Sequence, residues 1–98
     1  MGIRKINWSR KATTNFHSIL QWYQTERGPS YASKFFIGIL STIELIAKMP
    51  TIGIVEEKIS NSKITYYSFL SHPKYRIIYR YTNTDLFIVA IRSTQMKK

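Results

Sequence analysis

The segment from Ser30 to Ala47 carries apolar side chains at helical spacing for more than three turns, and this pattern limits the possible folds more than any other feature. Pro50 ends the pattern. Ser30 is placed to cap the helix, and Gly38 inside it is expected to permit close packing. The stripe, which should face a core, consists of Phe35, Phe36, Ile39, Leu40, Ile43, Ile46 and Ala47.

A strand and a first helix are predicted before this segment. Apolar and polar residues alternate from Ile3 to Trp8, which indicates a short half-buried strand. Ser9 can then cap a helix with apolar residues at helical spacing, and Gly28-Pro29 stops it. Because so short a link joins the two predicted helices, they should form an antiparallel hairpin.

The remainder of the chain is predicted to form strands. Ile52 to Val55 is a candidate edge strand, and three strands joined by polar turns follow as an antiparallel meander. The order predicts an α+β fold in which the helical hairpin packs on one face of a mainly antiparallel sheet and leaves the other face open. The three strands of the meander are Lys63 to Leu70, Tyr75 to Tyr81 and Leu86 to Arg92.

Composition narrows the functional classes. The 98 residues suggest a single domain over 1–98, and 15 Lys and Arg against 5 Asp and Glu give a formal net charge of +10, which favours anionic partners. The absence of cysteine excludes disulfides and thiolate metal sites, and no motif points to a metal or a small-molecule cofactor. No apolar run approaches the roughly 20 residues of a membrane span, so we expect a cytoplasmic protein without membrane contacts.

The residue order of the C-terminal third resembles that of a known family. Residues 74–81 read Lys-Tyr-Arg-Ile-Ile-Tyr-Arg-Tyr, and a polar turn separates them from the last predicted strand. With Trp8-Ser9 near the beginning and Met49-Pro50, then Gly53, after the second helix, this order is similar to the RelE/ParE superfamily of bacterial toxins. Arg92 resembles an arginine that ParE-like members often carry at the end of the last strand, which favours that branch.

The resemblance implies the toxin of a type II toxin–antitoxin (plasmid stabilisation) system, neutralised by a cognate antitoxin that covers the open face of the sheet. ParE-like members are associated with inhibition of DNA gyrase, and the favoured interpretation is a toxin that binds such a target without catalysis. One alternative is a RelE-like endonuclease that cleaves mRNA on the ribosome. A second alternative is a non-toxic basic module that binds nucleic acid.

The resemblance also singles out site residues. Arg76 matches one residue of the RelE nuclease set and is the catalytic candidate only if the chain is a nuclease. Without gaps, the two lysine positions of that set fall on Tyr67 and Phe69 and its C-terminal arginine on Met96, and none of these can replace the missing charges. The predicted target- or nucleic-acid-binding residues are Arg76, Arg80, Arg92, Lys63, Tyr67, Lys74, Tyr75 and Lys97.

Overall fold

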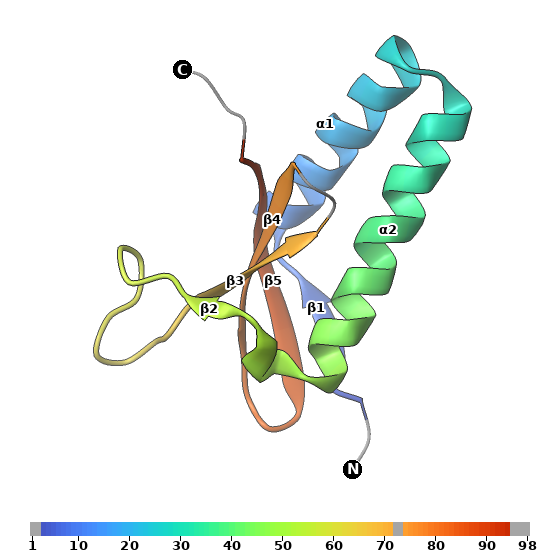
Figure 1. The fold of residues 1–98 in the computed structure, drawn as a ribbon. Coiled ribbons are helices and arrows are strands. Elements are labelled where there is room, and N and C mark those ends of the chain that lie inside the picture. Colours follow the sequence, from blue (N-terminus) through green and yellow to red (C-terminus); the bar gives the residue numbers. More distant parts are fainter. Residues whose placement is uncertain (1–2, 72–73, 95–98) are drawn as a thin grey trace.

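The computed structural model describes residues 3–71 and 74–94, in which two antiparallel helices pack on one side of a five-stranded sheet (Figure 1). The sheet has the order β1-β5-β4-β3-β2, with β1 parallel to β5 and all other pairs antiparallel. This arrangement confirms the predicted α+β fold. The elements are β1 (Lys5–Trp8), α1 (Arg10–Glu26), α2 (Pro29–Lys48), the 3-10 helix η1 (Pro50–Ile52), β2 (Ile54–Val55), β3 (Tyr67–Ser71), β4 (Tyr75–Tyr81) and β5 (Asp85–Ser93).

The hydrophobic core lies between the helices and the sheet. Strand periodicity puts Tyr75, Ile77 and Tyr79 of β4 on the helix side, and all three are buried there. The helices contribute the predicted stripe except for Phe36, which is 41% exposed, and Leu40, which is only partly buried and outside the core cluster. The buried helical residues of the core are Ala12, Phe16, Tyr23, Ala32, Phe35, Ile39, Ile43, Ile46 and Ala47.

The beginning of α1 is tied to an irregularity in β5. Ile78 of β4 pairs with Ala90 and Tyr79 pairs with Ile88, so Val89 is an extra residue in β5. The Ser9 hydroxyl donates to the Val89 carbonyl at 2.9 Å and accepts from the backbone N–H of Ala12 at 2.9 Å. The predicted cap residue therefore also satisfies a carbonyl at the bulge.

Ser9→Ala should lower the free energy of unfolding by about 1–2 kcal/mol, because it removes the helix cap and leaves the Val89 carbonyl without its side-chain donor. Ser9→Thr keeps a hydroxyl at the same position and should cost less than half as much. Urea unfolding of the wild type and both variants measures the difference. Equal losses for alanine and threonine would show that the hydroxyl contributes little.

Two details of the second helix differ from the prediction. Its N-cap is Gly28, whose φ of 94° lets the chain reverse, and Pro29 occupies the first turn, so Ser30 is not the cap. A proline lacks the N–H that a cap would satisfy and already has a helical φ, which explains this earlier start. At Gly38 an added Cβ would find no heavy atom within 4 Å, so the expected close packing is wrong.

By length and composition α2 could cross a membrane, with a mean hydropathy of 1.3 in its most apolar window. In this fold it packs on the sheet, and its apolar residues exceed those needed for the buried stripe. The surplus is exposed on the helix surface, where the largest side chains are Tyr31, Phe36, Ile37 and Leu45.

Tyr79 fixes the segment that leads from α2 into the sheet. Its hydroxyl donates to the Pro50 carbonyl at 2.6 Å and accepts from the Gly53 N–H at 3.1 Å. The tyrosine side chain is fully buried. A single core hydroxyl thus satisfies one carbonyl and one N–H of the η1 segment, which positions β2 at the edge of the sheet.

The third predicted strand begins later than expected. Lys63 to Tyr66 belong to a loop that projects from the sheet, and β3 starts only at Tyr67 (Figure 1). The Asn61 side-chain oxygen accepts from the N–H groups of Lys63 and Ile64, and the Ser60 hydroxyl accepts from the Tyr66 N–H. These side-chain bonds occupy the N–H groups of Lys63, Ile64 and Tyr66, which explains why the alternating sequence does not extend β3.

Candidate functional site

The open face of the sheet carries three arginines that the sequence analysis predicted as binding residues. Arg76 and Arg80 lie on the side of β4 opposite the core, and Arg76 pairs directly with Arg92 of β5 across the two strands. Arg92 is exposed, whereas the other two arginines are partly buried. The register therefore brings Arg76 and Arg92 together. We call Arg76, Arg80 and Arg92 the open-face arginines.

Arg76 is held by residues that the sequence analysis did not single out. Its Nη1 donates to the Ser68 hydroxyl at 3.1 Å, and that hydroxyl donates to the Glu56 carboxylate at 2.5 Å. Ser68 is fully buried and its two partners are partly buried, so these bonds are partly shielded from water. Ser68 of β3 pairs with Ile78 of β4, and no short-range sequence pattern reveals this pairing. The guanidinium of Arg76 is thereby held on the β3 side of β4 by contacts within the chain.

The other partly buried arginine packs on an aromatic ring. The Arg80 guanidinium carbon lies 4.1 Å from the centre of the Phe87 ring, its neighbour across β4 and β5. This cation–π contact orients the side chain over the face. Ile78 lies between Arg76 and Arg80 on the open side of β4 and pairs with Ala90 of β5. These two apolar residues are only 2% and 4% exposed, although the helices lie on the other side of the sheet. The open face thus combines positioned positive charges with buried apolar residues beneath them.

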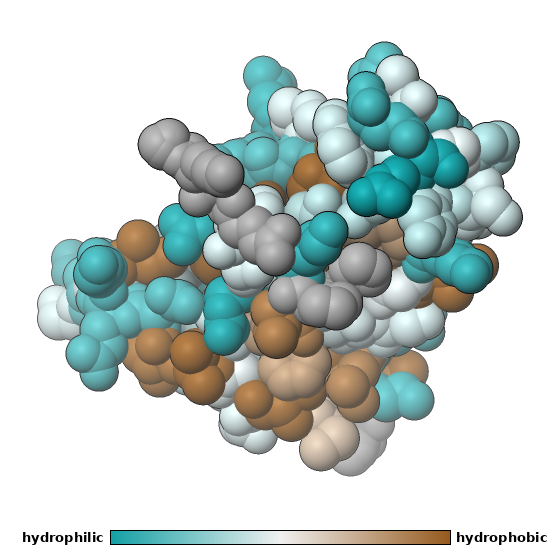
Figure 2. All heavy atoms as spheres, turned by 45° about the horizontal axis from the view of Figure 1, so that its top comes forward, coloured by the Kyte–Doolittle hydropathy of each residue, from teal (hydrophilic) through white to brown (hydrophobic). Residues whose placement is uncertain are grey.

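Exposed apolar side chains border the open-face arginines. Leu70 of β3 is in register with Arg76, and Ile54 of β2 is in register with Ser68, so both share the open face. Both are about half exposed, as are Val55 and Ile59 nearby in sequence. Figure 2 shows hydrophobic atoms next to hydrophilic ones on the side from which the 56–66 loop projects. A partner that covered this face would bury apolar area and meet positive charge.

The other predicted binding residues are not gathered here. Lys63 lies on the exposed loop, and Lys74 is exposed just before β4. Tyr75 is buried in the core and donates to the Tyr23 hydroxyl at 3.4 Å. Tyr67 faces the helices, where its ring lies 5.6 Å from Tyr79. Lys97 and Met96 lie outside the described residues.

Tyr67 belongs to a tyrosine cluster at the margin of the core. Its ring centre lies 5.2 Å from that of Tyr81, and the Arg4 guanidinium lies 5.4 Å from the Tyr81 ring. Burial raises the pKa of Tyr81, and the Tyr67 hydroxyl contributes to the same shift. The cluster is engaged in internal packing, so these rings are not presented together with the open-face arginines.

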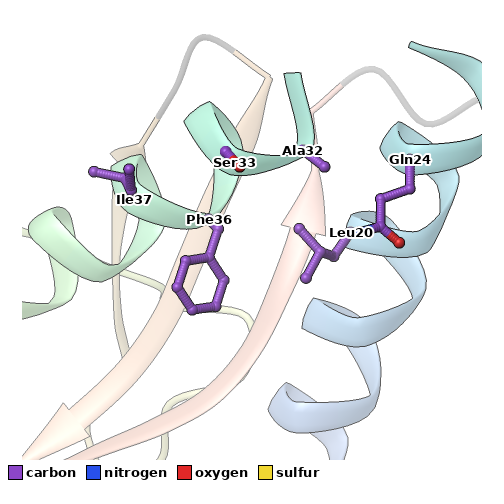
Figure 3. A pocket seen from close by; sticks show the side chains of 6 residues that line it. All are labelled: Leu20, Gln24, Ala32, Ser33, Phe36 and Ile37. Atoms are coloured by element: carbon purple, nitrogen blue, oxygen red, sulfur yellow. The ribbon is translucent and has the colours of Figure 1, made fainter. Parts of the chain in front are cut away.

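A separate hollow lies between the two helices. It has a volume of about 340 Å³ and is lined by Leu20 and Gln24 of α1 and by four residues of α2, all shown in Figure 3. Leu20 and Phe36 point into the space between the helices, and Ile37 is 62% exposed. This hollow is a second apolar surface, separate from the open face. The α2 residues are Ala32, Ser33, Phe36 and Ile37.

One known family matches almost the whole chain. The family described as the ParE toxin of the type II toxin-antitoxin system, parDE, matches residues 6–98. The chain belongs to the ParE toxin family. Among solved structures it is similar to a chain of the chromosomal ParDE toxin–antitoxin system from P. aeruginosa, with a TM-score of 0.76, 16% identity and coverage of 95% of this chain and 98% of that chain. At this identity the likeness shows the fold. None of the curated protein sequences is significantly similar.

Family membership confirms the resemblance to ParE-like toxins and implies an antitoxin as a partner of this ParE-family chain. The structure also shows where the lysine positions of the RelE nuclease set lie, which an ungapped alignment places on Tyr67 and Phe69. Both residues pack against the core from the helix side, whereas Arg76 is on the open face. In this ParE-family chain, those two positions and Arg76 therefore lie on opposite sides of the sheet.

The described part of this ParE-family chain contains no group of three or more His, Cys, Asp or Glu side chains arranged to hold a metal ion. The acidic group that lies nearest in the hydrogen-bond network to Arg76 is Glu56, which already accepts from Ser68. Asp85 is partly exposed at the start of β5, where it pairs with Lys5 of β1, and hydrogen bonds from Thr84 and Asn7 lower its pKa. The open-face arginines and the exposed apolar side chains beside them are suited to binding anionic and apolar groups.

Proposed function

We propose that this ParE-family chain is a cytoplasmic toxin, a single domain over residues 1–98, that acts by binding a protein target without catalysis. DNA gyrase is the candidate target, because the ParE-like branch is associated with it. An antitoxin neutralises the toxin by covering the open face of the sheet. The observation that carries the proposal is the anchored Arg76, in register with the exposed Arg92 of β5 and beside the exposed apolar residues of β2 and β3.

The composition of the open face supports a protein partner. Arginine is enriched at protein interfaces, where its planar guanidinium binds carboxylates with two parallel hydrogen bonds. Leu70 and Ile54 supply the apolar contacts that such an interface buries. A net charge of +10 disfavours the close approach of a second copy and favours an acidic partner. An antitoxin with acidic and apolar residues on one segment has the complementary chemistry.

The same face offers little for the RelE-like alternative. Cleavage of RNA through its 2′-hydroxyl requires a group that removes a proton and a group that delivers one. The open-face residues of β3 and β4 are Ser68, Leu70, Arg76, Ile78 and Arg80, and an arginine stays protonated throughout the physiological range. Arg76 could stabilise phosphate charge, but a nuclease would need further groups from elsewhere.

Induced expression with and without the neighbouring gene tests the proposal. The expected result is growth arrest that the neighbouring gene relieves, accompanied by altered plasmid supercoiling and unchanged mRNA 5′ ends. Codon-spaced mRNA cleavage would replace the proposal with the nuclease alternative. Normal growth in the absence of the neighbouring gene would favour the non-toxic nucleic-acid-binding module.

Arg92→Glu should weaken antitoxin binding at least about tenfold, because it reverses one exposed charge of the open face and places it opposite Arg76. Titration calorimetry with the purified product of the neighbouring gene measures the affinity. Arg10→Glu makes the same charge change on the exposed first turn of α1 and should shift the affinity less than about threefold. Equal effects of the two variants would contradict antitoxin binding at the open face.

A further inference from the structure

A second cationic surface lies at the tip of the helical hairpin, away from the open-face arginines. A pocket of about 210 Å³ is formed there by the end of α1, the beginning of α2 and the residue before β4. We call it the hairpin-tip pocket. It is lined by Trp22, Tyr23, Arg27, Tyr31, Lys34, Phe35 and Lys74.

Three cations from three different segments converge on this pocket. Arg27 follows α1, Lys34 is on α2 and Lys74 precedes β4, and all three are exposed. None of the described residues that line the pocket is acidic. The Arg27 guanidinium carbon lies 5.6 Å from the centre of the Tyr31 ring, which holds this charge at the rim. The pocket is therefore suited to an anionic ligand.

Aromatic rings form its walls. Tyr23 and Phe35 are buried, with ring centres 5.1 Å apart, and they belong to the rigid core. Trp22 packs edge-on against Tyr23 at 5.2 Å, which fixes its orientation, yet it remains 51% exposed. Tyr31 is 46% exposed on the opposite helix. Two large rings are thus presented to solvent on a rigid support, beside the three cations.

We propose that the hairpin-tip pocket binds one nucleotide unit of a single-stranded nucleic acid. A base would stack on the exposed ring of Trp22 or Tyr31, and Arg27, Lys34 and Lys74 would contact the flanking phosphates. Aromatic platforms within a positively charged depression are the recurrent means by which proteins bind single strands irrespective of sequence. Binding of a simple inorganic anion would use the cations but would leave both exposed rings without a role.

This inference goes beyond the proposed function and does not depend on toxicity. The open-face arginines lie on β4 and β5, whereas the hairpin-tip pocket is built mainly from the two helices. An antitoxin on the open face could leave the pocket accessible. The sequence analysis placed Lys74 with the strand arginines, and the structure places it at this pocket instead.

Fluorescence anisotropy of a labelled ten-nucleotide thymidine strand, titrated with the purified full-length chain at 0.1 M salt, tests the inference. Trp22→Ala and Lys34→Glu should each weaken binding about tenfold, since one removes a stacking platform and the other a phosphate contact. Trp22→Phe keeps an aromatic ring and should retain most of the affinity. Circular dichroism of each variant verifies that it is folded.

Lys48→Glu is the matched control, because it makes the same charge change at the other exposed end of α2. It should weaken binding less than about threefold at this salt concentration. Equal losses for Lys34→Glu and Lys48→Glu, or unchanged binding by Trp22→Ala, would overturn the inference in favour of diffuse charge attraction. Competition by poly-glutamate as effective as that by the oligonucleotide would overturn it in favour of an acidic protein ligand.

Discussion

Gly53→Ala should lower the free energy of unfolding by about 3 kcal/mol. An added Cβ would overlap the Tyr79 hydroxyl and lie 2.8 Å from the Ser68 carbonyl oxygen and 3.0 Å from Cζ of Tyr79. The backbone at Gly53 is extended, so the cost comes from overlap and not from backbone strain. Urea unfolding monitored by circular dichroism measures the loss.

Gly38→Ala is the matched control for this substitution. Gly38 lies inside α2, and an added Cβ would meet nothing within 4 Å. Alanine is the better helix former, so the variant should be more stable than the wild type by about 0.5–1 kcal/mol. A destabilising effect at Gly38, or a neutral one at Gly53, would contradict the packing described for these positions.

Tyr79→Phe should lower the free energy of unfolding by about 2 kcal/mol at neutral pH, because the Pro50 carbonyl and the Gly53 N–H lose their shared partner. The ring remains, so no large cavity forms. Leu86→Met, a similarly buried position where volume is nearly conserved, serves as the comparison and should cost less than about 1.5 kcal/mol. A loss for Tyr79→Phe no larger than that of the comparison would show that the hydroxyl bonds contribute little.

The pH dependence of stability provides a second readout for Tyr79. Burial raises the pKa of Tyr79 from its ordinary value near 10 to about 12 in the folded chain. The folded state therefore holds the proton more tightly than the unfolded state. The resulting stability is fully present below about pH 10 and is lost as the pH rises toward 12.

Phenylalanine does not titrate, so Tyr79→Phe should lose less stability than the wild type between pH 10 and 12. Burial also raises the pKa values of Tyr75 and Tyr81, and both chains share the loss that these groups cause. Chemical unfolding at a series of pH values measures the gap between the two chains. A gap that stays constant from pH 8 to 12 would show that Tyr79 does not titrate differently on folding.

Local patterns predicted most of the secondary structure. The helical stripe of α2, the Ser9 cap and the alternation of tyrosine and arginine in β4 all have their cause within a few residues, and the structure confirms them. The errors in secondary structure arose where a neighbouring residue made a more favourable local interaction than the one predicted. Pro29 displaced Ser30 at the start of α2, and the side chains of Ser60 and Asn61 kept residues 63–66 out of β3.

The sequence by itself determined that the chain is a basic member of the ParE toxin family, and that Arg76 and Arg80 share one side of a strand. Side-chain periodicity assigns residues to a face without knowledge of the partner strand. Only the tertiary structure decided what meets on that face. Arg92 became the neighbour of Arg76 through the register of β4 and β5, and Glu56 and Ser68 came to hold Arg76 through pairing with β3. Such contacts depend on how distant segments pack, which no local pattern specifies.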